Sequence, residues 1–135
     1  MSRAAPRVVL HGRVSTANLT RAETADRARV VSDVRYDVAL DLTEARTRAE
    51  FGTVTTVSFT ATASATWMDF LGVGVDRVIV NDHEQEVDYD GARVFLRDLR
   101  SVNTVRVHAR GSYSRTGEGL HRFVDPADGE TYLYT

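Results

Sequence analysis

The residues best suited to chemistry lie near the end of the sequence. The block 117–123 reads G-E-G-L-H-R-F and places a carboxylate, an imidazole and a guanidinium, those of Glu118, His121 and Arg122, in one short loop. Asp125 then opens a D-P-A-D-G turn, and the glycines beside Glu118 permit positive φ. Because such side chains transfer protons in enzymes, these residues are candidates for acid–base catalysis, or for a ligand or interdomain docking surface. The alternative is a self-bonded loop in which Arg122 pairs with Asp125 or Glu118.

The remaining histidines do not suggest a metal centre. The sequence has four histidines, His11, His83, His108 and His121, and no two of them have the spacing of a metal-binding pair on a helix or strand. The string H-E-Q-E at 83–86 resembles a metal-binding string, but we expect a solvated turn at the tip of a hairpin there. There is no cysteine, and every positive side chain is arginine, which excludes thiolate ligands and lysine Schiff-base chemistry. We therefore predict no metal site and no cofactor.

Two pairs of aspartates could in principle share acid–base work. Asp88 lies near Asp90, and Asp125 lies near Asp128, but both pairs fall in predicted turns. Aspartate is favoured in turns because its carboxylate accepts hydrogen bonds from backbone N–H groups. No nucleophile-elbow sequence supports a catalytic serine either.

Aromatic residues give the better signal of a surface. In the last strand, Tyr132 and Tyr134 share one face and Leu133 lies on the other. An exposed apolar patch of this kind usually marks a partner or ligand site. The predicted ligand or partner surface comprises Tyr113, Glu118, His121, Arg122, Phe123, Tyr132 and Tyr134.

Length and charge limit the classes of function. A chain of 135 residues forms one domain, and its net charge of −2 without a polybasic tract argues against nucleic acid and anionic membranes as partners. No apolar run approaches the roughly 20 residues of a membrane span, and the run V-V-L at 8–10 is too short for a secretory signal. We expect a cytoplasmic protein with a flexible or loosely attached extension at 1–17 and a domain at 18–135.

Local patterns predict a mainly β fold. The string T-R-A-E at 20–23 indicates a capping box, with Asn18 as a competing cap, for a surface helix ending near Val31. Alternation of apolar residues predicts a half-buried strand at 34–42, and further strands follow at 51–62, 66–71, 76–80, 87–89, 93–96 and 104–113. The pairs N-D at 81–82 and D-G at 90–91 indicate turns. The expected fold is a β-sandwich or saddle-like set of antiparallel sheets with one short N-terminal helix.

The segment 113–135 reads Y-S-R-T-G-E-G-L-H-R-F-V-D-P-A-D-G-E-T-Y-L-Y-T. It resembles the segment that closes the N-terminal β-domain of zinc aminopeptidases of the aminopeptidase N family, in its actinobacterial form. The strings N-L-T-R-A-E at 18–23 and Y-D-V-A-L-D-L at 36–42 are similar to the family's opening phrases, whereas the middle agrees in pattern only and 1–17 has no counterpart. What carries over is scaffold, namely Tyr113, Gly117, Glu118, Gly119, Leu120, His121, Arg122, Phe123, Asp125, Pro126, Asp128, Gly129, Tyr132, Leu133 and Tyr134.

The resemblance implies a domain without the family's chemistry. The family's zinc motif, its Gly-x-Met-Glu-Asn motif and its anchor for the substrate amine belong to sequence that follows the Y-L-Y-T text, which ends here at Thr135. The first hypothesis is a stand-alone binding or accessory module without peptidase activity, which binds a second copy as a homodimer, a separate protein domain or a small molecule. The second is a fragment of a full-length zinc aminopeptidase. The third is a small metal-free enzyme of the cyclase or isomerase type in actinobacterial secondary metabolism.

Overall fold

The N-terminal helix begins where its cap predicts. The computed structural model describes residues 20–135, so the extension at 1–17 and the alternative cap Asn18 lie outside the described residues. Helix α1 (Arg21–Val30) starts after Thr20, whose side chain accepts the Glu23 N–H at 3.1 Å while the Glu23 carboxylate accepts the Thr20 N–H at 2.9 Å. These reciprocal bonds satisfy N–H groups that the first turn leaves free. The helix contains no buried residue, which confirms a surface helix.

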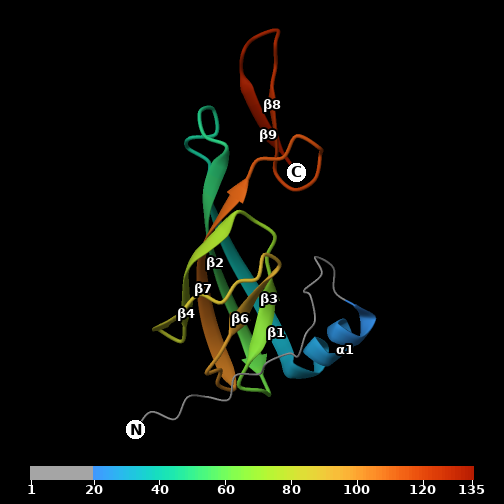
Figure 1. Cartoon of the computed structure of the whole chain (residues 1–135), viewed down its shortest axis with the longest axis vertical. Coiled ribbons are helices and arrows are strands. Elements are labelled where there is room, and N and C mark those ends of the chain that lie inside the picture. The colour runs from blue at the N-terminus through green and yellow to red at the C-terminus, as the bar shows by residue number, and fades with distance from the viewer. Residues whose placement is uncertain (1–19) are drawn as a thin grey trace.

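Nine strands follow α1 in the described chain, in three antiparallel units (Figure 1). The main sheet has the order β1-β2-β7-β4-β5, a second sheet pairs β3 with β6, and a hairpin pairs β8 with β9. The hairpin extends beyond the end of the main sheet, at the opposite end of the molecule from α1. The bounds are β1 (Val31–Asp41), β2 (Glu50–Ala61), β3 (Thr66–Asp69), β4 (Gly74–Val80), β5 (His83–Gln85), β6 (Arg93–Leu96), β7 (Val102–Ser112), β8 (His121–Val124) and β9 (Thr131–Tyr134). The expected mainly β fold of antiparallel sheets with one short helix is confirmed.

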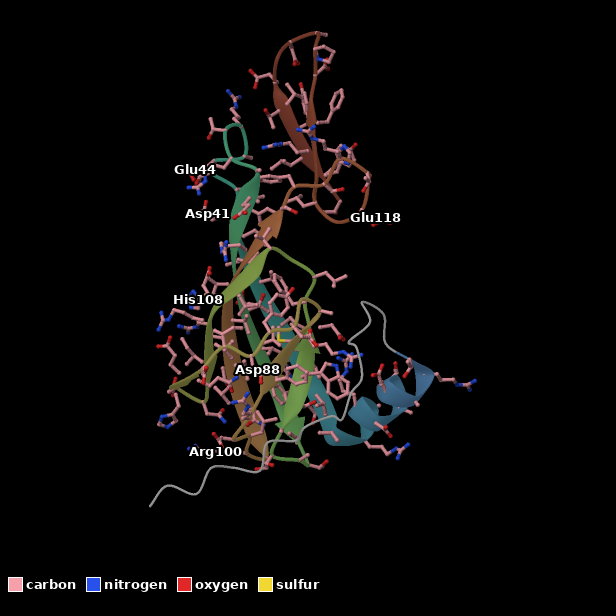
Figure 2. All side chains as sticks on the ribbon, in the orientation of Figure 1. Asp41, Glu44, Asp88, Arg100, His108 and Glu118 are labelled. Atoms are coloured by element: carbon pink, nitrogen blue, oxygen red, sulfur yellow. The ribbon has the colours of Figure 1, made fainter. Side chains whose placement is uncertain are left out.

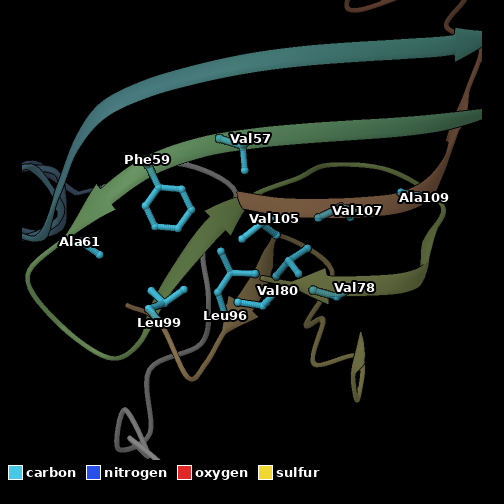
Figure 3. Packing of buried hydrophobic residues seen from close by; sticks show 11 residues of the cluster. Val57, Phe59, Ala61, Val78, Val80, Leu96, Leu99, Val105, Val107 and Ala109 are labelled. Atoms are coloured by element: carbon cyan, nitrogen blue, oxygen red, sulfur yellow. The ribbon is translucent and has the colours of Figure 1, made fainter. Parts of the chain in front are cut away.

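The core lies between one face of the main sheet and the β3–β6 sheet (Figure 3). Val78, Val94 and Val105 are fully buried, and they come from β4, β6 and β7. Removing a side chain of this size from water stabilises the fold by about 1.5–3 kcal/mol. The residues of the buried cluster are Val57, Phe59, Ala61, Val78, Val80, Val94, Leu96, Leu99, Val105, Val107 and Ala109.

A buried amide links the loops at the lower end of this core. Asn103 is 1% exposed, and its side-chain oxygen accepts hydrogen bonds from the Asn81 amide at 2.9 Å and the Arg100 N–H at 2.7 Å. Its own amide donates to the Arg100 carbonyl at 2.6 Å. Since a buried polar group is costly unless it is bonded, this network fixes the 81–82 turn against the 97–101 loop.

The expectation of a half-buried strand at 34–42 is wrong in its burial. Strand β1 forms and pairs with β2, but none of its residues is buried. Tyr36 lies opposite Val57 in the register, and yet Tyr36 is 63% exposed whereas Val57 is 3% exposed. The physical reason is position, because β1 is the edge strand and the buried cluster ends at β2.

Two further expectations need correction around the second hairpin. The string at 83–86 is not a solvated turn, because His83–Gln85 forms strand β5 directly after a turn at Asn81 and Asp82, both of which have positive φ. The expected strand at 87–89 does not form, and Tyr89 makes one isolated bridge to Val94. Here the tight N-D turn returns the chain to pair with β4 several residues earlier than the apolar pattern suggests.

Candidate docking site on the C-terminal hairpin

The β8–β9 hairpin sorts its side chains onto two faces. His121 lies opposite Tyr134, and Phe123 lies opposite Tyr132. Because opposite residues of an antiparallel pair share a face, these four side chains lie together, and we call them the aromatic face. Arg122, Val124, Thr131 and Leu133 occupy the other face.

Three of the four rings of the aromatic face are exposed, and the His121 ring is partly buried. Phe123 is 46% exposed, Tyr132 48% and Tyr134 52%. The His121 and Tyr134 rings stack with their centroids 4.6 Å apart. The structure therefore brings four residues of the expected partner surface onto one side of a projecting hairpin.

Hydrogen bonds set the polar ends of this face. The His121 Nδ1 accepts the Gly117 N–H at 2.9 Å, so Nδ1 carries no proton in this arrangement. The Tyr132 hydroxyl donates to the Asp128 carboxylate at 2.8 Å. That bond raises the pKa of Tyr132. The pKa of Asp128 is lowered by two hydrogen bonds that its carboxylate accepts, first from the Glu130 N–H and second from the Tyr132 hydroxyl. At neutral pH the face therefore presents an uncharged phenol held by a carboxylate.

Arg122 and Tyr113 anchor the hairpin instead of joining the aromatic face. The Arg122 guanidinium donates to the carbonyl oxygens of Ala45 at 2.9 Å and Arg48 at 2.5 Å, both in the turn between β1 and β2. The guanidinium carbon lies 5.0 Å from the centre of the Tyr113 ring, and that ring packs on Phe51. Burial raises the pKa of the Tyr113 hydroxyl. The expected pairing of Arg122 with Asp125 or Glu118 is therefore wrong. The Arg122 guanidinium instead binds the carbonyls of Ala45 and Arg48, because the hairpin lies close to the turn between β1 and β2.

The four catalytic candidates are not gathered into one site. Glu118 is exposed on the loop before β8, between Gly117 and Gly119 with their positive φ values of 86° and 66° (Figure 2). Asp125 caps its own turn by accepting the Ala127 N–H at 2.8 Å. His121 begins β8 and Asp125 follows its last residue, so the two lie about 13 Å apart at the rise of a strand. None of these residues lines the cavity between α1, β1, β2 and β3 or the hollow beside His108.

The described residues do not fit a metal ion. Within 20–135, no group of three or more histidine, aspartate or glutamate side chains is placed to hold one. His108 lies on β7, far from the Glu118 loop (Figure 2). Glu84, in the string that resembles a metal site, instead receives two hydrogen bonds from Arg77 at 3.0 and 3.1 Å, which lower its pKa.

A second feature, which has no signal in the sequence, is a cavity of about 400 Å³ between α1, β1, β2 and β3. Its wall includes the Trp67 ring, over which the guanidinium carbons of Arg93 and Arg27 lie at 5.0 and 5.6 Å. Arg93 is 4% exposed and donates to both oxygens of Glu23 at 3.0 and 2.9 Å, and Arg27 pairs with Asp69 at 2.5 Å. These partners lie 42 and 70 residues apart, so no local pattern could have revealed them.

The described part of the chain contains no helix long and apolar enough to cross a membrane.

Comparison with known proteins supports the resemblance seen in the sequence. The chain is 37% identical over 123 residues to aminopeptidase N of Streptomyces lividans. The match covers 87% of this chain and 14% of the relative, so the chain spans a small part of that protein's length. No protein-family model matches the chain. The chain is therefore similar to a part of aminopeptidase N, and its mainly β fold is consistent with a fragment that resembles an N-terminal domain of that enzyme.

Proposed function

We propose that this chain is a binding or accessory module related to the β-domain of aminopeptidase N, and that it has no peptidase activity by itself. It docks a separate protein domain on the aromatic face of the β8–β9 hairpin. The observation that carries the proposal is the placement of His121, Phe123, Tyr132 and Tyr134 on one side of a hairpin that stands beyond the main sheet.

The chemistry of this face suits a protein partner. Tyrosine and histidine combine an apolar ring with a polar tip, and aromatic residues are enriched at the centres of protein interfaces. The cross-strand register also holds the rings in fixed positions, so that little side-chain freedom remains to be lost on binding. The face lines neither the cavity beside Trp67 nor the hollow beside His108, which favours a protein surface over a small molecule.

A second reading is supported by the comparison itself. Because the match covers 14% of its relative, the chain can correspond to one part of a full-length zinc aminopeptidase. The docked partner would then be the catalytic part of that same enzyme. No observation favours the third hypothesis, a small metal-free enzyme, since its candidate residues are dispersed along the hairpin and its loop.

The first test concerns activity. We expect the purified chain to leave aminoacyl anilides unhydrolysed both with added zinc and with a chelator, because the described residues gather no metal-ligand set. The measurement is release of the anilide chromophore, with intact aminopeptidase N as the positive control. Zinc-dependent release by the pure chain would refute a module without peptidase activity.

The second test concerns docking. The probe is Streptomyces lividans aminopeptidase N from which the 123 matched residues have been deleted, titrated with this chain in a calorimeter. We expect a complex that the double variant Phe123→Ser with Tyr134→Ser weakens by about thirtyfold or more, as loss of interface hot spots does. Val124→Ser is the matched control, because Val124 is 55% exposed on the other face of the same hairpin. Failure of the unaltered chain to bind, or equal weakening by the control, would contradict docking on the aromatic face.

A further inference from the structure

Strand β1 is a long sheet edge that the described residues leave open. It is 11 residues long and ends the strand order of the main sheet, with β2 on its inner side alone. The N–H and C=O groups along its other side therefore have no partner strand among residues 20–135. Unpaired groups of this kind are a template for pairing with another strand.

The two edges of the main sheet differ in protection. The opposite edge strand, β5, is three residues long and ends the sheet with little to pair. In β1 a register irregularity lies between Ser32 and Arg35, but the segment 35–41 pairs regularly with β2. That segment contains no proline or glycine, and its charged residues, Arg35, Asp37 and Asp41, all lie on one face of the strand.

The segment 35–41 also carries an exposed apolar row. Every second residue lies on the same face as the buried Val57 of β2, and these residues are Tyr36, Val38 and Leu40. Their exposed fractions are 63, 54 and 46%. A strand added beside β1 would place a second row of side chains directly against these three. The open edge and the apolar row thus coincide.

We propose that a second copy of this chain pairs along β1, antiparallel and centred on Val38. In this register Val38 lies opposite the partner's Val38, and Tyr36 lies opposite the partner's Leu40. On the other face Arg35 lies opposite the partner's Asp41. Every apolar residue of the row meets an apolar residue, and the two-fold axis makes two arginine–aspartate pairs.

Charge selects this register over its neighbour. A two-fold pairing must keep like faces together, so alternative centres on the strand lie one residue to either side. A centre at Asp37 sets that carboxylate against its own copy, and a centre at Ala39 sets Asp37 against the partner's Asp41, so both alternatives are repulsive. Within residues 20–135, Arg35 and Asp37 make no ion pair, and their opposite residues on β2 are Ser58 and Thr56. The charges of the strand therefore have no partner on β2 that would oppose self-pairing.

Pairing seven residues of one edge makes a small interface, so we expect an association weaker than that of standard interfaces of about 1,600 Å². The inference goes beyond the proposed function, because the dimer surface does not include the aromatic face. The hairpin lies beyond the end of the main sheet, whereas the pairing segment lies within that sheet (Figure 1).

The test uses a charge reversal between copies, followed by light scattering and sedimentation over a range of protein concentrations. The unaltered chain is expected to dimerise. Arg35→Asp and Asp41→Arg each convert both interchain pairs into repulsive ones and are expected to weaken the dimer about tenfold or more, which corresponds to about 1.4 kcal/mol. An equimolar mixture of these two variants restores opposite charges at both positions, and we expect it to dimerise again. Arg35 and Asp41 lie about 20 Å apart on one strand, so rescue cannot arise within one chain.

Asp37→Arg is the matched control. In the proposed register Asp37 faces the partner's Ala39, so this variant is expected to remain dimeric and not to rescue Arg35→Asp. If Asp37→Arg weakened the dimer, or rescued Arg35→Asp in a mixture, the proposed register would be overturned. A chain that stays monomeric at every concentration would overturn the proposal, and so would a dimer that neither charge reversal affects.

A second measurement does not depend on Asp41, which also accepts the Thr43 N–H and hydroxyl. The chain has no cysteine, so Val38→Cys introduces a single thiol that faces its own copy across the two-fold axis. Opposite residues of paired strands have Cα atoms at distances that a disulfide spans. We expect rapid formation of a covalent dimer by Val38→Cys and slow formation by Tyr36→Cys, which faces the partner's Leu40. Equal rates, or no covalent dimer, would overturn the pairing.

Discussion

Single residues far apart in the sequence decide how α1 is attached. Glu23 has two roles, since its carboxylate closes the capping box with Thr20 and also accepts two hydrogen bonds from Arg93. Arg93 in turn lies against the Trp67 ring in a setting where it is almost fully buried. A buried guanidinium needs its carboxylate, because removing one partner leaves an uncompensated charge.

The Glu23–Arg93 pair predicts a specific dependence of stability on acid. Hydrogen bonding to Arg93, and then to the Thr20 N–H, lowers the pKa of Glu23 from 4.5 to about 2. A lowered pKa in the folded state means that the stabilisation is fully present above pH 4.5 and is lost as the pH falls towards 2. We expect Glu23→Gln to lower the melting temperature at neutral pH. The difference in melting temperature between this variant and the unaltered chain should narrow as the pH falls from 4.5 towards 2.

Thermal unfolding followed by circular dichroism at several pH values measures this effect. Glu118→Gln is the control, because Glu118 is exposed in the loop before β8 and should leave the curve unchanged. A constant gap between Glu23→Gln and the unaltered chain down to pH 2 would contradict the role of the carboxylate charge.

At the scale of elements, the hairpin depends on contacts outside itself. Two-stranded hairpins are marginally stable alone, and β8 and β9 each have four residues. Arg122 supplies the anchor through the carbonyls of Ala45 and Arg48, and Arg46 pairs with Glu130 across the same gap. The hairpin is therefore attached to the turn between β1 and β2 by charged groups.

This attachment predicts the behaviour of Arg122→Ala. Each hydrogen bond from a charged donor stabilises by roughly 1.5–3 kcal/mol, so its loss should raise the opening of the hairpin by about tenfold or more. We expect faster hydrogen exchange at the amides of β8 and β9, while the amides of β7 stay protected. Arg115→Ala, an exposed arginine in the neighbouring loop, serves as the control. Unchanged exchange in β8 and β9 would show that Arg122 is not the anchor.

Elements with local signals could be predicted from the sequence, and contacts between distant elements could not. Thr20 and Glu23 define the helix start within four residues, and the N-D turn at 81–82 is equally local. The alternation in β1 correctly indicated a strand, but its burial depends on what covers the sheet. For the same reason the sequence placed Tyr132 and Tyr134 on one face but assigned Arg122 the wrong partner, since Ala45 lies 77 residues away.

The whole molecule is built around one sheet with unequal ends. Its buried cluster is centred on β2, β7 and β4, and the β3–β6 sheet covers that part of one face. Beyond this covered region lie the exposed β1 row and the projecting hairpin, whereas the cavity beside Trp67 lies at its border. The two surfaces proposed for recognition, the β1 row and the hairpin, are therefore surfaces that the second sheet does not cover.

The inequality of the two sheet edges also limits the growth of any assembly. If the long β1 edge paired with the opposite edge of the next molecule, the contact would be head-to-tail, and such contacts polymerise into open fibres unless they close into a ring. The three-residue β5 strand gives that mode little to grip. When β1 pairs with its own copy, no long sheet edge stays unpaired in the described part of either molecule, so assembly stops at the dimer. The shortness of β5 thus favours a closed dimer over an open fibre.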